Sequence, residues 1–484
     1  MMSEQQEPIK LRANSTPSVR WALASLSLSM LLSSLGTSSA NVGLPTLAIV
    51  FDVSFQEVQW VVLAYLLAIT IMIVSVGRLG DIIGRRRLLL AGTILFTVAS
   101  AFCGAAPSLW WLIAARALQG LGAAIMMAIT VAFVSDVVPK QRIGSAMGLV
   151  GTMSAIGTAL GPSLGGMLIA AFNWQAIFLV NIPLGILTFL LAYRHLPVDR
   201  KCLRSGSVRF DTVGTLLLAL TLAAYALAMT LGRGSFGAVN ITLLAAAAFG
   251  LVGFILAESK TASPLIRLAI FRDPRLSASL AMSTLVSTVM MATLVVGPFY
   301  LSHGLGLGAM SVGMVMSVGP LAAALTGVPA GRLADAFGAH RVTIVGLIGI
   351  AAGALIMCLI PATRGIVGYI APIVTMTVGY ALFQTANNTS VMREVPADQR
   401  GVMSGMLNLS RNLGLISGAS VMGAVFDLAS GTTDITTASP EAVATALRIT
   451  FGLAAMLIVA ALAIAFASRA LATPLSLASS SSGK

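Results

Sequence analysis

Residues 77–87 read GRLGDIIGRRR, and residues 331–341 read GRLADAFGAHR. Six residues of the first stretch recur in the second at a constant separation of 254 positions. Self-similarity at a fixed separation indicates a chain built from related structural units. We therefore predict two related halves, each with one copy of this stretch, which we call the first and second GRL phrases. The recurring residues are Gly77, Arg78, Leu79, Asp81, Gly84 and Arg87, and then Gly331, Arg332, Leu333, Asp335, Gly338 and Arg341.

A second set of residues repeats at almost the same separation, 257 positions. It begins at Gly122 in the first half and at Gly379 in the second. In a membrane chain, such a repeat is typical of transporters with a substrate site between the halves. The recurring residues are Gly122, Val138, Pro139, Gly144, Gly148, Gly157 and Gly161, and then Gly379, Val395, Pro396, Gly401, Gly405, Gly414 and Gly418.

The composition indicates an all-α polytopic membrane protein. Hydrophobic residues make up 57% of the chain and charged residues only 9%, whereas about a quarter of the residues in soluble proteins are charged. Fourteen apolar stretches are long enough to cross about 30 Å of hydrocarbon as helices. We predict transmembrane helices at 22–45, 57–77, 88–105, 109–134, 143–171, 175–193, 212–231, 237–257, 277–301, 310–330, 343–361, 365–390, 401–426 and 446–468.

The formal net charge of +13 follows the membrane topology. When the N-terminus is assigned to the cytoplasm, 24 of the 29 lysine and arginine residues fall in cytoplasmic segments and three in outer loops. This distribution is the positive-inside bias. The sequence therefore predicts an inner (plasma) membrane protein with both termini in the cytoplasm. Its basic residues face lipid and cytoplasm, and we expect no nucleic-acid partner.

The separation of the GRL phrases also predicts the organisation of the chain. Both copies lie on the same side of the membrane, with eight predicted helices between them, whereas two adjoining six-helix halves would place only six there. We infer that two helices, the seventh and eighth, are inserted between the halves. The predicted parts are a cytoplasmic tail (1–20), an N-terminal half (21–193), connectors with the inserted pair (194–276), a C-terminal half (277–468) and a second cytoplasmic tail (469–484).

Two further motifs lie within the predicted helices. Arg116 and Gln119 follow the pattern R-x-x-Q-G-x-G, with Arg116 about 10 Å inside its helix at 1.5 Å per residue. An ionisable residue at that depth is a functional candidate, although the side chain of an arginine can also extend to the interface. The fifth helix contains G-x-x-x-G-P-x-x-G-G, a smooth face for helix packing with a proline that bends a helix. Its residues are Gly157, Gly161, Pro162, Gly165 and Gly166.

Together these motifs resemble those of the major facilitator superfamily. The GRL phrases resemble its loop signature, the Arg116 pattern its fourth-helix motif for proton coupling, and the motif at 157–166 its antiporter motif. With fourteen helices, the chain resembles the 14-span drug:proton antiporters of the multidrug efflux type, which implies antibiotic resistance as a physiological effect. We expect gating at the GRL phrases, with the two aspartates as cytoplasmic latches. The gating residues are Gly77, Asp81, Gly84, Arg85, Gly331, Asp335, Gly338 and Arg341.

The first helix departs from the family pattern L-D-x-T-x-x-N-x-A-L-P. Asn41 matches it, but Gly36 stands where the acid is usual. Among the sixteen acidic residues, none lies near the middle of a predicted helix, and Glu57 lies in an outer connection. Arg411, in contrast, lies about 16 Å inside its helix at 1.5 Å per residue. We therefore take Arg116, Gln119, Asn41, Arg411 and Glu57 as coupling or cavity candidates and leave the proton-carrying acid unassigned.

Several polar and methionine side chains are candidates for lining a substrate cavity. Polar groups in hydrocarbon need partners, so these residues either bind substrate or hydrogen-bond between helices. Methionine suits adaptable pockets, but it is also common in ordinary cores. A cavity with arginines and no carboxylate disfavours multivalent cations, so we expect neutral, zwitterionic or anionic amphiphiles as substrates. The candidates are Met126, Met127, Tyr380, Gln384, Asn387 and Asn408.

These features predict a secondary active exporter of amphiphilic small molecules or drugs, working by alternating access in exchange for protons. The alternative is a dedicated exporter or facilitator of one metabolite class without classical proton coupling. An enzyme is not expected, because His195, His303 and His340 lie far apart in or beside loops and form no catalytic or metal-binding pattern. We expect no cofactor and no metal. A channel filter is absent, and the sequence leaves open both a receptor role and a periplasmic adaptor.

Overall fold

The computed structural model describes residues 19–53, 55–58, 60–198, 211–230, 237–261, 264–266, 268–359, 364–396, 399–430 and 439–481. Every regular element in these ranges is a helix, which confirms the predicted all-α class. Most of the predicted N-terminal tail, residues 199–210 of the first connector and the last three residues of the chain lie outside the described residues.

The N-terminal half consists of long apolar helices joined by short turns. An apolar helix satisfies its backbone N–H and C=O groups internally, as a hydrocarbon environment requires. The elements are α1 (Val19–Val50), α2 (Phe55–Val58), α3 (Trp60–Ile83), α4 (Arg85–Gly104), α5 (Leu109–Val137), the 3₁₀ turn η1 (Lys140–Arg142), α6 (Ile143–Ala171), α7 (Ala176–Leu179) and α8 (Asn181–His195).

The inserted hairpin and the C-terminal half also consist of long apolar helices. The hairpin is α9 (Thr212–Thr230) and α10 (Ala238–Lys260), followed by the 3₁₀ helix η2 (Leu268–Arg272). The half itself contains α11 (Pro274–Phe299), the π-helical turn η3 (Tyr300–Gly304), α12 (Ala309–Phe337), α13 (Ala339–Leu359), α14 (Gly365–Glu394), α15 (Arg400–Ser430) and α16 (Pro440–Ser481).

The described residues contain fourteen segments that are long and apolar enough to cross a membrane, which confirms the predicted number. Several of their ends differ from the prediction by a few residues, and three differences are larger or change the element. Helix α1 continues to Val50, and α16 continues to Ser481, well beyond the predicted end at 468. The predicted helix 175–193 is divided between α7 and α8. Pro183 explains the division, because it cannot donate the helical hydrogen bond to the carbonyl of Leu179.

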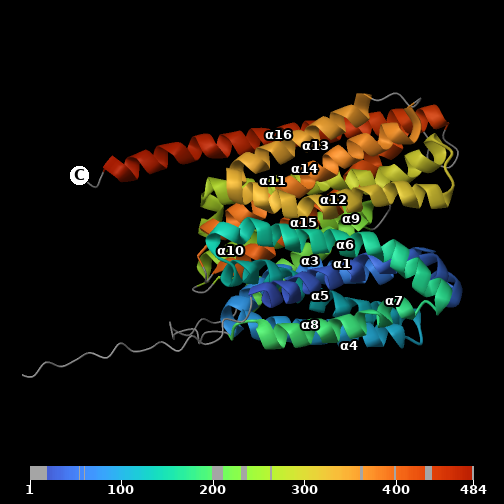
Figure 1. Cartoon of the computed structure of the whole chain (residues 1–484), viewed down its shortest axis with the longest axis horizontal. Helices are drawn as coiled ribbons and strands as arrows, with labels where there is room; N and C mark the ends of the chain where they lie inside the picture. Colours follow the sequence, from blue (N-terminus) through green and yellow to red (C-terminus); the bar gives the residue numbers. More distant parts are fainter. Residues whose placement is uncertain are drawn as a thin grey trace, which may run out of the picture.

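The two halves lie side by side in Figure 1, with α1 to α8 in blue to green and α11 to α16 in yellow to red. They meet where α6 packs against α12 and where α3 packs against α15. Helix α9 of the inserted hairpin contacts both α3 and α15, so the hairpin covers one seam between the halves. This placement gives the inserted pair a contact with each half of the protein.

Glycines allow the halves to approach closely at one end of the bundle. A Cβ atom on Gly144 of α6 would stand 2.7 Å from the carbonyl oxygen of Gly331 in α12. A Cβ on Gly401 of α15 would stand 2.6 Å from the Asp81 carboxylate of α3. Both separations are too short for a side chain. Gly144 and Gly401, one from each repeat, are therefore contact points between the halves, and we call this the GRL end of the bundle.

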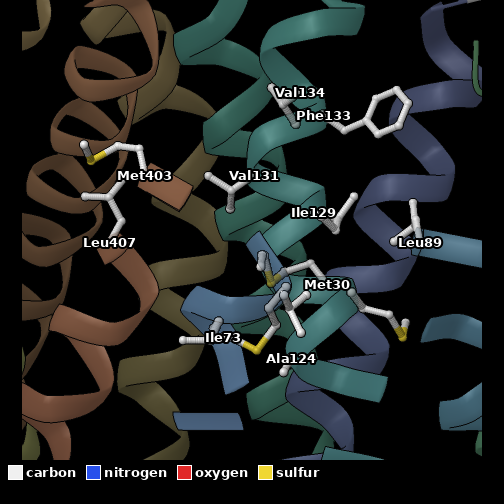
Figure 2. Close-up of a cluster of buried hydrophobic side chains, with 14 of the residues drawn as sticks. Met30, Ile73, Leu89, Ala124, Ile129, Val131, Phe133, Val134, Met403 and Leu407 are labelled. Atoms are coloured by element: carbon white, nitrogen blue, oxygen red, sulfur yellow. The ribbon is translucent and has the colours of Figure 1, made fainter. Parts of the chain in front are cut away.

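A buried hydrophobic cluster closes the space between the halves near the GRL end. Figure 2 shows Met403 and Leu407 of α15 facing Ile73 of α3 and Ala124 and Val131 of α5. All five side chains are less than 5% exposed and belong to one continuous cluster. Helices from both halves thus bury apolar surface against each other here, at roughly 25 cal/mol per Å². We refer to these five residues as the apolar plug.

Candidate functional site

The Asp81 carboxylate lies at the crossing of α3 and α15. Its two oxygens accept hydrogen bonds from the backbone N–H groups of Gly401, at 3.1 Å, and Val402, at 3.2 Å. These groups form the first turn of α15, where unpaired N–H groups and the helix dipole favour an anion. Arg85 of α4 donates to Asp81 Oδ1 at 2.8 Å. Asp81 of the N-terminal half therefore caps a helix of the C-terminal half.

The Asp335 carboxylate makes the equivalent contact in the opposite direction. It accepts from the N–H of Gly144 at 2.9 Å and from the N–H and Oγ of Ser145 at 2.7 Å each. These groups belong to the first turn of α6. Arg393 of α14 donates to Asp335 Oδ1 at 2.6 Å. We call the contacts of Asp81 and of Asp335 the first and second latches.

The N–H groups that each aspartate accepts from belong to the opposite half, not to the helices that its own GRL phrase joins. Gly84 and Gly338 supply the turn after each aspartate, with φ of 110° and 88°, values that favour glycine. Among the gating candidates, the side chain of Arg341 is exposed and contributes to neither latch.

An ionic bridge beside the first latch was missed in the sequence. Asp136, at the end of α5, accepts from Arg400 of α15 at 2.7 Å and also pairs with Arg85. It therefore links both halves. The repeat could have drawn attention to Asp136, because position 136 corresponds to position 393 at the separation of 257. The first half has an aspartate there and the second half an arginine, so both positions carry a charge. Arg393 then supplies the cation of the second latch, the role that Arg85 has in the first.

Arg116 is fully buried in the N-terminal half, at 0% exposure. It donates to the carbonyls of Val61 in α3, at 2.9 Å, and Gly36 in α1, at 3.0 Å, and to Gln119 Oε1 at 2.5 Å. The ring of Tyr65 lies 4.2 Å from its guanidinium carbon, within the range of a cation–π contact. Arg116 therefore joins three helices of one half, and the reading in which it extends to the interface is wrong.

Gln119 completes this network and connects it to a fourth helix. Its Nε2 donates to Ser100 Oγ of α4 at 2.7 Å, while its Oε1 accepts from Arg116. Among the described residues, no carboxylate pairs with Arg116, so its positive charge is offset by carbonyl dipoles and ring faces. The Gly36 carbonyl is one of these dipoles, at the position where the family pattern has an acid.

Replacing Gly36 by aspartate is expected to shift transport toward cationic substrates. A Cβ at Gly36 would lie 3.2 Å from the ends of Tyr65 and Phe96, so the carboxylate would enter beside Arg116 with small shifts of those side chains. The added negative charge offsets that of Arg116 in a low-dielectric site. Growth inhibition by monocationic dyes in an efflux-deficient host measures the effect. Gly36→Asn is the control, and equal dye resistance in both variants would contradict the expectation.

The glycine motif at 157–166 forms a contact between α6 and α1. A Cβ on Gly157 would stand 2.5 Å from the carbonyl oxygen of Leu31, and one on Gly165 would stand 3.4 Å from that of Ser39. The hydroxyl of Ser38 donates to the Gly157 carbonyl at 3.0 Å. Gly161 faces Ser38 in the same way, and Pro162 and Gly166 lie on the same helix. This geometry is the packed glycine face that the spacing predicted.

The cavity candidates fall into two groups. Met126 and Met127 are buried in the cluster around the apolar plug, and Asn387 donates to the carbonyl of Ser279 on α11 at 3.2 Å. The contacts of these three residues favour the packing alternative. Tyr380 and Gln384 of α14 are half-buried, and Asn41 of α1 is exposed. Glu57 is exposed on the short helix α2 and forms no ion pair with Arg116 in the described part of the chain.

Arg411 lies in the middle of α15 on the face that turns toward the N-terminal half. Ser404, on the same face two turns earlier, donates to the carbonyl of Ala128 in α5. Asn408 lies between them and donates to the Ser404 carbonyl at 2.9 Å. Arg411 is half-buried, and its Nε is buried without a hydrogen-bond partner among the described residues. A guanidinium without a counter-ion at this depth is able to receive an anionic group.

A cavity of about 820 Å³ opens at the GRL end within the C-terminal half. Arg275 and Arg341 line it together with the Asp335–Arg393 pair of the second latch. Its walls come from α11, α12, α13, α14 and α16, and helical periodicity along the sequence does not predict that these helices enclose a cavity. It borders the second latch and lies within the C-terminal half.

Comparison with known sequences identifies related membrane transporters. The sequence model of the Major Facilitator Superfamily matches residues 26–419. The "Uncharacterized transporter YebQ" of Escherichia coli K12 is 32% identical over 83% of this chain and 88% of its own length. The "Riboflavin transporter RibZ" of Clostridioides difficile is 30% identical over 84% and 88%. The "Multidrug resistance protein Stp" of Mycobacterium tuberculosis is 32% identical over 80% and 72%.

Solved structures resemble the fold at much lower sequence identity. The human organic anion transporter MFSD10 (TETRAN) aligns with a TM-score of 0.65 and 14% identity, covering 93% of this chain and 99% of that one. The proton:xylose symporter XylE aligns with a TM-score of 0.64 and 13% identity, covering 90% and 94%. At these identities the likeness concerns the fold alone.

Proposed function

Because this chain belongs to the major facilitator superfamily, we propose that it is a secondary active transporter that exports amphiphilic small molecules or drugs from the cytoplasm in exchange for protons. The observation that carries this proposal is the pair of latches at the GRL end. Each latch joins the two halves through a carboxylate and a helix N-terminus. A rocking motion of one half against the other would form or break all the hydrogen bonds of a latch together. Multidrug relatives such as Stp support the drug-export reading.

Alternating access follows from where the halves touch. In the present conformation both latches and the apolar plug close the GRL end, which the positive-inside bias assigns to the cytoplasm. A path to the cytoplasm requires both latches to release and the plug to separate. Two parallel repeats that rock against each other achieve this with the substrate site between them. The proposed cycle thus begins from a cytoplasm-closed state in the plasma membrane.

The substrate class follows from the charges between the halves. Arg411 faces the N-terminal half with no ion-pair partner among the described residues, and no acid lies near the middle of a long helix in the two halves. In a medium of low dielectric constant, an uncompensated cation strongly disfavours a second cation. We therefore propose neutral, zwitterionic and anionic amphiphiles as preferred substrates. Strong resistance to dicationic antiseptics alone would contradict this.

A dedicated metabolite exporter is the second candidate function. The observation in its favour is the relative named as a riboflavin transporter, which is 30% identical over most of both chains. The Arg411 region is compatible with a single anionic metabolite as well as with several drugs. Counterflow separates the two, because a multidrug exporter exchanges several unrelated compounds while a dedicated one exchanges a single chemical class.

Proton exchange is tested in liposomes that contain the purified protein and a pH-sensitive dye. An imposed gradient of an anionic amphiphile is expected to drive proton movement in the opposite direction, and Arg411→Gln is expected to reduce both fluxes together. Arg332→Gln is the control, since Arg332 is exposed and belongs to neither latch. Substrate flux without proton movement would make the protein a facilitator.

A further inference from the structure

The inserted hairpin contains two carboxylates that the transport proposal does not use. Asp211 precedes α9 and caps it, because its Oδ1 accepts from the N–H of Gly214 at 2.8 Å. Such capping is the usual role of an aspartate before a helix. Its other oxygen, Oδ2, is buried and has no hydrogen-bond partner among the described residues. One oxygen is therefore used by the helix and the other is left over.

Glu258 approaches from the last turn of α10. It is only 3% exposed, although glutamate is almost never fully buried without a partner. Its Oε1 accepts from the N–H of Leu265 at 3.2 Å, in the connector that follows α10. Its Oε2 is buried and has no partner in the described part of the chain. Glu258 repeats the pattern of Asp211, with one oxygen held by the backbone and one unsatisfied.

Gly214 shows that the two carboxylates face each other. A Cβ on this glycine would lie 2.6 Å from Asp211 Oδ2 and 2.6 Å from Glu258 Oε1. These two oxygens are therefore at most twice that distance apart. The absence of a side chain at position 214 makes the space in which the two acids meet. Two buried carboxylates at this separation cannot both be ionised without a large electrostatic penalty.

The surrounding charges do not remove this penalty. Besides the two acids, the charged group that acts on Glu258 from a packed element is Arg78 of α3, in the first GRL phrase. Lys260 lies two residues along α10, but its side chain is exposed. No lysine or arginine forms an ion pair with either acid in the described ranges. A single arginine compensates one negative charge of the pair.

We propose that Asp211 and Glu258 form one proton-binding site, in which a shared proton links the two carboxylates while the GRL end is closed. The shared proton lies between Asp211 Oδ2 and Glu258 Oε1, the two oxygens that approach Gly214. The buried Oδ2 then gains a partner, and the pair has one negative charge facing Arg78. This assignment places an acid–proton site in the inserted hairpin, whereas the two halves lack an acid near the middle of a long helix.

The position of the site connects it to the gate. Arg78 lies three residues before Asp81 on α3, so both belong to the same turn region of that helix. Helix α9 contacts α3 and α15, the two helices that the first latch joins. Loss of the shared proton leaves both carboxylates ionised. The hairpin then has a second negative charge beside Arg78, and the two carboxylates repel each other. This coupling to the gate rests on the proposed antiport function, but proton sharing itself does not.

Infrared difference titration of the full-length protein in lipid nanodiscs tests the site directly. Wild type is expected to show the carbonyl stretch of a buried protonated carboxylic acid at neutral pH, and Glu258→Gln and Asp211→Asn are each expected to abolish it. Both variants keep the backbone contact, since asparagine also caps helices and glutamine retains a carbonyl oxygen. Asp273→Asn, at the exposed cap of α11, is the control and keeps the band.

The outcomes separate this proposal from the transport proposal. A band that persists in both Asp211→Asn and Glu258→Gln overturns the shared proton. So does a band whose intensity changes with sodium concentration and not with pH. Loss of the band in both variants supports the site even if liposomes show no substrate-driven proton flux, in which case the antiport function fails alone. If antiport also holds, the change of transport rate with pH is expected to be several-fold smaller in Asp211→Asn and Glu258→Gln than in Asp273→Asn.

Discussion

Replacing Asp81 and Asp335 together by asparagine is expected to open the GRL end and to reduce substrate export more than tenfold. Each latch consists of charge-assisted hydrogen bonds, which contribute about 1.5–3 kcal/mol apiece, on a helix N-terminus that favours an anion. Losing about 1.4 kcal/mol per latch changes the closed-to-open ratio about tenfold, and about 100-fold for both. Spin-label distances across the GRL end measure the ratio, and vesicle uptake measures transport.

The single variants and one control make this result specific. Asp81 is the more buried of the two, with a side chain 3% exposed against 13% for Asp335, so Asp81→Asn is expected to shift the ratio more than Asp335→Asn. Arg332→Gln changes the charge of the second GRL phrase at an exposed side chain and is expected to leave the distances unchanged. Unaltered distances in the double variant would refute the latches as elements that hold the gate.

Substituting methionine for each of the two arginines within the helices is expected to produce opposite phenotypes. Arg116→Met leaves the carbonyls of Val61 and Gly36 without their donor in a fully buried site, and each unsatisfied group costs about 1–3 kcal/mol. We expect the melting temperature in detergent to fall by about 5 °C or more. Arg411→Met removes no hydrogen bond or ion pair seen in the described residues, so its melting temperature is expected to stay close to wild type.

Transport assays then distinguish a packing role of Arg411 from a role in substrate binding. Arg411→Met is expected to lose export of anionic amphiphiles while retaining neutral ones, because only the anions gain from the guanidinium. Arg411→Lys is the charge-preserving control and is expected to retain most of the anion export. If Arg411→Met instead destabilises the protein as much as Arg116→Met does, then Arg411 is a packing residue and the proposed substrate preference loses its support.

Much of the architecture was predictable because it depends on properties that repeat along the chain. Apolar length defines a membrane helix by itself, and the repeated glycines mark equivalent positions in the two halves. The motif at 157–166 predicted a close helix contact, and the structure shows that contact with α1. Arg116 was identified from its pattern with Gln119 and from its depth, since a buried guanidinium is unusual in any membrane helix.

The partners of the site residues were less predictable. Asn387 shared a helix face with Gln384 in the sequence, yet it donates to α11 inside its own half. The bridge from Asp136 to Arg400 joins residues separated by 264 positions. Hydropathy and helical periodicity describe one helix at a time. They contain no information about which other helix packs against a given face.

The chain alone therefore established fourteen membrane helices, a duplicated half, an inserted pair and a family resemblance, because hydrocarbon imposes the same length and polarity on every span. The tertiary structure decided what the twin aspartates do. Asp81 meets N–H groups 320 positions away, at the start of α15, and Asp211 meets Glu258 across the hairpin. Such meetings depend on how closely packed helices cross, and glycine contacts between distant segments set that crossing.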